Sequence, residues 1–123
     1  MKSYKELDVW QQGVLLVEQI YRLTRSFPKE ETYGLVSQLR RAAISIPSNI
    51  AEGAGRGSRK EYAQFAAIAH GSCCEIETQI ILCDRLGLVP HGECEKIART
   101  LAGIGRMLKA LSKSLRNSET QKP

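Results

Sequence analysis

The segment 97–115 reads IARTLAGIGRMLKALSKSL, and it decides the fold class of this chain. Its apolar residues recur at alternating steps of four and three residues, as they do along one face of an α-helix. The repeat runs without a gap through Ile97, Leu101, Ile104, Leu108, Leu111 and Leu115. So regular a seam predicts a helix over about residues 92–115 that packs its apolar face against other helices.

Three earlier segments show helical periodicity as well, and we expect helices over residues 8–25, 32–54 and 59–86. Pro28 ends the first, because the residue before a proline disfavours the α region. The glycine-rich stretch 53–57 separates the second from the third. Gly87 is a typical C-terminal cap of the third, and Pro90 prevents its continuation.

No segment alternates apolar and polar residues for long enough to form a strand. Four helices joined by short turns predict an all-α, antiparallel, up-down-up-down four-helix bundle in one domain over 1–123, with a frayed tail at 117–123. Pro47 lies inside the second helix, where a missing donor and a steric clash predict a kink. The alternative is two shorter helices, with Pro47 in the first turn of the later one.

Two sites carry signals for a helix start. Ser58 is followed three residues later by Glu61, a capping box in which the hydroxyl accepts from a free backbone amide. Asp8 followed by Gln11 resembles a second capping box at the first helix.

Composition restricts the class of protein. Among 123 residues, 18 Lys and Arg against 13 Asp and Glu give a formal net charge of +5, which suggests an anionic partner. The N-terminus lacks the apolar core of a signal peptide, and no apolar run approaches the roughly 18 residues of a membrane span. The cysteines have no CxxC spacing; they are Cys73, Cys74, Cys83 and Cys94. We therefore expect a soluble cytoplasmic protein with reduced thiols and no membrane partner.

The strongest charge feature lies in the last helix. From residue 96 to 116 there are basic residues and no acidic ones; the basic set is Lys96, Arg99, Arg106, Lys109, Lys113 and Arg116. With the leucine seam inward, all six fall on the solvent face. Their counter-charge could be nucleic-acid phosphate, an acidic protein surface or acids of this same chain. Phosphate binding predicts a steep loss of affinity with salt.

A second basic cluster surrounds the break between the second and third helices. It consists of Arg40 and Arg41, expected on the outer side of the second helix, and of Arg56, Arg59 and Lys60 near the glycines. Free amides at a helix N-terminus beside cations favour phosphate binding. Alternatively, Arg56 pairs with Glu52 four residues earlier.

Metal and catalytic chemistry have little support. His70, Cys73 and Cys74 stand at helical spacing, and His91 and Cys94 form a second such pair. However, Cys73 fits the core stripe, and a zinc site normally has a tighter ligand set. The chain lacks the ExxH motif of di-metal bundles and any nucleophile triad. We expect no metal, no cofactor, no small-molecule substrate and no enzymatic activity.

Small residues in the last two helices indicate close helix packing. Gly103 and Gly105 each cost roughly 1 kcal/mol against alanine inside a helix, and a close contact would explain them. Together with the wide apolar face of the first helix, this predicts a homo-oligomer; close packing within one monomer is the alternative.

Five motifs carry a resemblance to a known family. They are LDVWQ at 7–11, YGL at 33–35, QLRRAA at 38–43, IPSNIAEG at 46–53 and SRKEY at 58–62. The chain resembles the bacterial four-helix-bundle proteins encoded in intervening sequences of 23S rRNA genes over about residues 4–90. Cys73, Cys74 and Cys94 are not part of that family's pattern. The family is similar to the accessory protein of diversity-generating retroelements, a basic bundle that associates with nucleic acid.

The resemblance implies an antiparallel bundle that assembles as a homopentamer around a central channel, with no established enzymatic activity. It leaves open whether the matching Arg40, Arg41, Arg59 and Lys60 bind phosphates or pair across subunits. From residues and resemblance together we expect RNA or DNA binding through the phosphate backbone by Arg40, Arg41, Arg56, Arg59, Lys60, Arg99, Arg106, Lys109, Lys113 and Arg116. The alternative is a protein-interaction scaffold whose basic face pairs with acidic protein surface.

Overall fold

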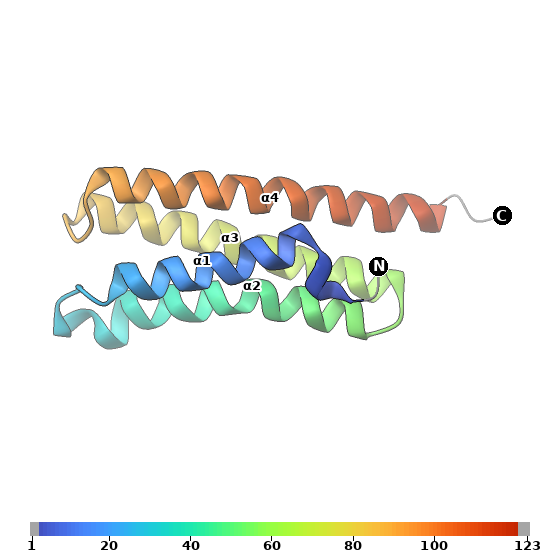
Figure 1. Ribbon diagram of the computed structural model, residues 1–123, viewed down its shortest axis with the longest axis horizontal. Helices are drawn as coiled ribbons and strands as arrows, with labels where there is room; N and C mark the ends of the chain where they lie inside the picture. The colour runs from blue at the N-terminus through green and yellow to red at the C-terminus, as the bar shows by residue number, and fades with distance from the viewer. Residues whose placement is uncertain (1–2, 121–123) are drawn as a thin grey trace.

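The computed structural model of the chain describes residues 3–120, with side chains as far as residue 117. Its four long helices are α1 Asp8–Thr24, α2 Ser37–Gly55, α3 Arg59–Arg85 and α4 His91–Thr120. Successive helices run in opposite directions along the long axis, so that each connection lies at one end of the molecule (Figure 1). No strand occurs within the described residues. The predicted all-α four-helix fold is confirmed.

The connection between α1 and α2 contains two short turns of helix. A 3-10 turn, η2 Lys29–Glu31, is followed by a π-helical turn, η3 Thr32–Val36. Inside η3, Gly34 leaves helical geometry with φ −104° and ψ −111°. The predicted start of the second helix at residue 32 is therefore too early, because the backbone of Gly34 interrupts the regular hydrogen bonding and α2 begins at Ser37.

Pro47 lies inside α2, which continues as one helix on both sides of it. Its ring faces α1 at Gly13, where an added Cβ would lie 3.4 Å from Pro47 Cδ and 3.3 Å from Ile46 Cγ2. Glycine in α1 thus makes room for the proline ring of α2. The alternative of two separate helices is wrong, and the kink at Pro47 stays a prediction.

The two predicted helix starts have different outcomes. Ser58 Oγ accepts a 3.0 Å hydrogen bond from the Glu61 backbone amide. The serine half of the predicted capping box at the start of α3 is therefore confirmed. Asp8 is instead the first residue inside α1, which has no side-chain cap. The Gln11 side chain donates to the carbonyl of Lys5 at 3.0 Å, in the short turn η1 Tyr4–Glu6 that precedes the helix. The predicted capping box at Asp8 is wrong, because Leu7 occupies the N-cap position and the Gln11 side chain bonds to the preceding turn.

The ends of α3 and α4 also differ from each other. Gly87 follows α3 with φ +70°, the left-handed conformation that a glycine cap adopts most easily. In contrast, α4 continues to Thr120, so residues 117–120 are helical and not frayed as predicted. Nothing in 117–120 removes a backbone donor, since the next proline is Pro123. The rest of the predicted tail, 121–123, lies outside the described residues.

The core lies along the centre of the bundle and includes five of the six seam positions of α4; these are Ile97, Leu101, Ile104, Leu108 and Leu115. Leu111 is half-buried. The largest completely enclosed side chains include Leu16 of α1, Ile46 of α2 and Ile76 of α3. None of the described helices combines the length and the apolar character that crossing a membrane requires.

Candidate nucleic-acid interface

The basic side chains of α4 are all exposed, as their place opposite the seam predicts. Lys96 is the only one of the six with an ion pair among the described residues: its Nζ lies 3.5 Å from Glu93 Oε1. The other five have no acidic partner within the part of the chain that the structure describes; they are Arg99, Arg106, Lys109, Lys113 and Arg116. The C-terminal half of α4 therefore carries positive charge that no described side chain neutralises by contact.

A shallow groove runs between α3 and α4, and we call it the α3–α4 groove. Two adjoining depressions of about 340 and 420 Å³ form it, and they share His70 and Lys109. Its polar lining includes His70, Cys74 and Glu77 from α3 and Arg106, Lys109, Ser112, Lys113 and Arg116 from α4. The basic half of α4 is thus one wall of a groove and not simply a convex surface.

Small residues on α4 leave room for this groove. Ala102 and Gly105 line it opposite His70. A Cβ added to Gly105 would lie 3.8 Å from His70 Nε2, an ordinary van der Waals distance. A Cβ added to Gly103 would meet only the Arg106 guanidinium, at 3.8 Å. Close packing within the monomer therefore does not explain either glycine.

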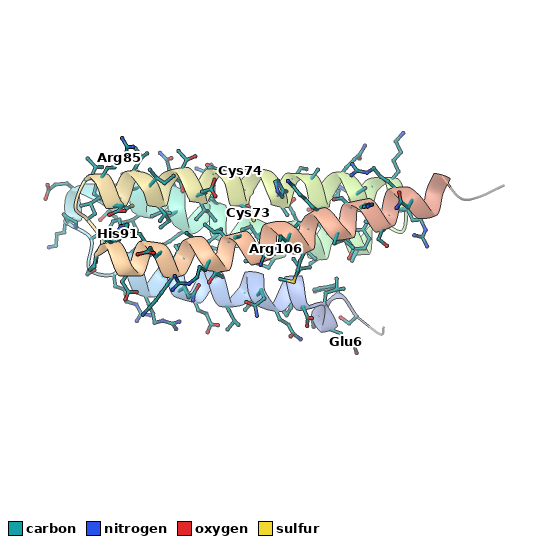
Figure 2. The ribbon with its side chains drawn as sticks, turned by 90° about the horizontal axis from the view of Figure 1, so that it is seen from above. Glu6, Cys73, Cys74, Arg85, His91 and Arg106 are labelled. Carbon is teal, nitrogen blue, oxygen red and sulfur yellow. The ribbon has the colours of Figure 1, made fainter. Side chains whose placement is uncertain are left out.

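His70 and Cys74 form the α3 side of the groove. Cys74 Sγ lies 3.9 Å from His70 Nδ1, one helical turn away. In Figure 2, which looks onto α4, Cys74 lies on α3 beside the stretch of α4 that carries Arg106. The sequence placed His70 and Cys74 on one helical face, but it did not indicate that this face adjoins the basic residues of α4.

The turn between α2 and α3 lies at the same end of the molecule as the C-terminal half of α4 (Figure 1). A depression of about 290 Å³ at this end is lined by Ser58 of the turn, by Arg59 at the start of α3 and by Leu115 of α4. The structure thus brings part of the second predicted basic cluster next to the first. Lys60 is exposed beside Arg59 and has no ion pair within the described residues.

Arg40 does not belong to this interface. The prediction that it lies on the outer side of the second helix is wrong: its Nε donates to Thr24 Oγ1 of α1 at 2.9 Å. Its guanidinium also lies 4.3 Å from the centre of the Tyr21 ring. Arg40 is half-buried against α1, because its position on α2 faces that helix.

Arg56 and Arg41 are also separate from the groove. Arg56 pairs with Glu52 at 3.1 Å, as the alternative interpretation expected, and lies 3.8 Å from Glu61. Its guanidinium is 5.1 Å from the centre of the Phe65 ring. Arg41 is exposed on α2. Arg56 thus has its charge compensated.

Lys96 and Arg99 lie at the other end of α4. Lys96 lines a depression of about 480 Å³ that is formed with α1, together with Arg22. Arg99 is exposed and lines neither part of the α3–α4 groove. The structure therefore divides the basic face of α4 into two parts, and its C-terminal part adjoins the turn before α3.

Most of this chain matches a described family. Residues 5–110 match the family of the 23S rRNA-intervening sequence protein. The chain belongs to that family. The match includes much of α4, beyond the region over which the motifs themselves carry the resemblance. No curated protein matches the chain.

A solved structure shares the fold of this family member. It is the crystal structure of a protein with unknown function from the S23 ribosomal protein family of Bacteroides thetaiotaomicron. The TM-score is 0.79 at 23% sequence identity, over 85% of this chain and 95% of that one. At this identity the likeness concerns the fold alone.

The IPSNIAEG string at 46–53 has a packing role in this chain. Asn49 Nδ2 donates to the Ser45 carbonyl at 2.6 Å, and Ser45 Oγ donates to Ser72 Oγ of α3 at 2.5 Å. At Gly53 an added Cβ would lie 2.9 Å from Phe65 Cβ. The string thus joins α2 to α1 through Pro47 and to α3 through Gly53, and no member of it lines the groove.

The cysteines differ sharply in their surroundings. Burial raises the pKa of the Cys73 thiol to about 12, with smaller contributions from Cys74 and Glu77. Burial also raises the pKa of Cys83 to about 11. The pKa of Cys94 is raised mainly by burial, and then by Asp84. Cys74 is the one exposed cysteine of the four.

The two histidine pairs do not meet. No group of three or more potential ligands from His, Cys, Asp and Glu occurs within residues 3–117. His91 lies at the start of α4, where its Nδ1 is 2.8 Å from Asp84 Oδ2 and its Nε2 is 3.2 Å from Glu95 Oε1. His70 lies instead near the middle of α3, where it lines the α3–α4 groove.

Proposed function

We propose that this chain is a non-enzymatic protein that binds RNA or DNA through the phosphate backbone. The single observation that carries the proposal is the α3–α4 groove, whose α4 wall is basic and has no ion pair among the described residues. Its phosphate ligands are Arg106, Lys109, Lys113 and Arg116, with Arg59 and Lys60 extending the positive surface around the end of the bundle. Arg99 contributes to the long-range field.

The spacing of these cations suits a polyanion. Residues 106 and 116 lie on one helix and are therefore roughly 15 Å apart along its axis, at 1.5 Å per residue. Double-stranded nucleic acid carries about one negative charge per 1.7 Å of axis, so several phosphates fit along this wall. A single small anion would engage only part of it.

The groove lining supports backbone contacts over base recognition. No Trp, Tyr or Phe is among the described residues that line its two depressions. Stacking of unpaired bases normally uses such aromatic rings. Lysine and arginine contacts to phosphates position a nucleic acid without reading its sequence. The proposed binding is therefore indifferent to sequence and sensitive to salt.

The test is a titration of labelled RNA and DNA at several salt concentrations. Neutralisation of four or five phosphates gives a slope of about −3.6 to −4.5 for log affinity against log salt with a duplex. The charge reversal Arg106→Glu, Lys109→Glu, Lys113→Glu should abolish binding while circular dichroism remains helical. Absence of binding at low salt would refute the proposal.

A matched control has the same change in net charge away from the groove. Arg22→Glu, Arg25→Glu, Arg41→Glu replaces three exposed cations of α1, its C-terminal end and α2. This variant should retain most of the affinity, since it lacks only long-range attraction. Equal losses in the two triple variants would mean that net charge, and not the groove, determines binding.

The proposal includes self-association in the cytoplasm, as the homopentamer that the family resemblance implies. Exposed large hydrophobic side chains on α3 and at its C-cap support an oligomer; they are Ile68, Ile81, Leu82 and Leu86. Sedimentation velocity of the wild type should give one species larger than a monomer. Leu82→Ser with Leu86→Ser should shift it toward smaller species, and a monomeric wild type would refute this part.

The same exposed apolar surface on α3 favours one alternative function, a protein-interaction scaffold. In that case the cations of α4 pair with acidic residues of a neighbouring subunit or partner. Light scattering across a salt series distinguishes the two functions. Dissociation of the oligomer by salt favours the scaffold, whereas a stable oligomer that releases RNA with salt favours phosphate binding.

A further inference from the structure

We propose that Cys74 is a site of reversible mixed-disulfide formation with a small anionic disulfide, and that this adduct closes the α3–α4 groove to nucleic acid. The juxtaposition that carries the proposal is an exposed thiol, an imidazole and two cations in one depression. The second half of the proposal rests on the proposed function, and the first half does not.

Cys74 has the contacts that thiol chemistry requires. Its Sγ lies 3.9 Å from His70 Nδ1, so a neutral imidazole protonated on Nε2 can receive the thiol proton. The thiolate, and not the thiol, is the nucleophile in disulfide exchange. Exposure of Cys74 leaves its sulfur accessible to a reagent from solvent.

The same depression is suited to an anionic reagent. Arg106 and Lys109 line it together with Cys74, and neither has an ion pair within the described residues. Glu77 is the one acid in the lining and lowers the positive potential there. Two cations against one carboxylate leave an excess of positive charge, which attracts the carboxylates of a disulfide such as oxidised glutathione.

The other cysteines serve as internal controls. Cys73, the neighbour of Cys74, is buried, as are Cys83 and Cys94. Burial raises the pKa of each of these thiols, so they hold little thiolate at neutral pH. Reaction should therefore stop at one adduct per chain.

The exchange balances without a further reactant. The Cys74 thiol passes its proton to His70 Nδ1, and the thiolate attacks one sulfur of the disulfide reagent. A new S–S bond forms as the reagent's S–S bond breaks. The departing thiolate takes up the proton and leaves as a thiol, so that one half of the reagent is reduced while Cys74 is oxidised.

The adduct would act on the groove in two ways. It occupies the depression of about 340 Å³ in front of Arg106 and Lys109. Its carboxylates also pair with these cations and so take the place of phosphates. Both effects remove phosphate contacts, and reduction of the mixed disulfide restores them.

The first experiment tests the thiol site without nucleic acid. The native protein is treated with oxidised glutathione or with cystamine, a cationic disulfide, and adducts are followed by intact mass and peptide mapping. We expect one glutathione adduct, at Cys74 and absent from Cys74→Ser. An adduct on another cysteine, or none on the wild type, overturns the proposal.

Charge selectivity separates a built site from a merely exposed cysteine. In Arg106→Gln, Lys109→Gln the ratio of the glutathione rate to the cystamine rate should fall about tenfold relative to wild type. The control Arg22→Gln, Arg25→Gln has the same net charge and should keep the wild-type ratio. Equal ratios in the two double variants overturn the role of the cations.

The second experiment compares RNA affinity of reduced and glutathionylated wild type. We expect about tenfold weaker binding by the adduct, corresponding to one or two lost phosphate contacts, with recovery after dithiothreitol. Treatment should leave the affinity of Cys74→Ser unchanged. An adduct without effect on affinity overturns the closure of the groove. A reduced protein that binds no RNA refutes the proposed function, while the rate ratios still decide the thiol site.

Discussion

Arg40 of α2 holds Thr24 of α1: its Nε donates a 2.9 Å hydrogen bond to the threonine Oγ1. The hydroxyl in turn donates to the Ile20 carbonyl at 2.7 Å, and Thr24 is buried. The guanidinium also lies over the Tyr21 ring. Arg40, which belongs to the QLRRAA motif, thus has a structural role, because its side chain connects α2 to α1.

Arg40→Ala should lower the free energy of unfolding by about 1–2 kcal/mol, because it removes a charged donor and a cation–π contact. Thr24 keeps its bond to Ile20, which limits the loss. Arg41→Ala is the matched control, since Arg41 is exposed, and should change stability by less than about 0.5 kcal/mol. Urea unfolding followed by circular dichroism measures both. Equal effects of the two variants would contradict the assigned contact.

This pair illustrates what the sequence can and cannot predict. The α4 seam determines its own buried face, so five of its six positions could be assigned from spacing alone. Arg40 and Arg41 are adjacent in sequence and alike in type, yet only the packing of α1 against α2 distinguishes them. Such a difference depends on the rotation of one helix relative to another, which local periodicity does not contain.

The candidate site shows the same limit. The exposed cations of α4 could be predicted from the seam, as could the shared face of His70 and Cys74. That the two faces border one groove depends on the register between α3 and α4. The approach of Arg59 to the C-terminal part of α4 likewise depends on the lengths of the helices. The apolar spacing predicted an end of α4 near residue 115, whereas the helix continues to Thr120.

Gly53→Ala should destabilise the protein by about 1 kcal/mol or more. Its Cβ would lie 2.9 Å from Phe65 Cβ and 3.0 Å from Tyr62 Cδ1, so α2 and α3 must separate. This cost exceeds the gain in helix propensity. Gly55→Ala is the control, because nothing lies within 4 Å of its Cβ. Thermal unfolding of the two variants should give opposite or clearly unequal shifts, and a stabilised Gly53→Ala would disprove the close approach.

Gly103→Ala should stabilise the isolated chain by roughly 0.5–1 kcal/mol, since alanine loses less backbone entropy in a helix. The only nearby atom, Arg106 Nη2 at 3.8 Å, does not obstruct a methyl group. Chemical unfolding at low and high protein concentration measures the effect. Destabilisation that grows with concentration would instead mean that a second copy of the chain packs against Gly103.

His91 should make stability depend on pH. Its pKa is raised, first by the hydrogen bond to Asp84, then by the charges of Asp84 and Glu95. Because the folded-state pKa lies above the unfolded value of about 6.5, the stabilisation is complete below that pH and is lost as pH rises through the folded-state pKa. The contact joins the end of α3 to the first turn of α4.

The melting temperature of wild type minus that of His91→Gln should therefore decrease between pH 5.5 and 8. A constant difference across this range would show that the His91–Asp84 contact contributes no proton-linked stability.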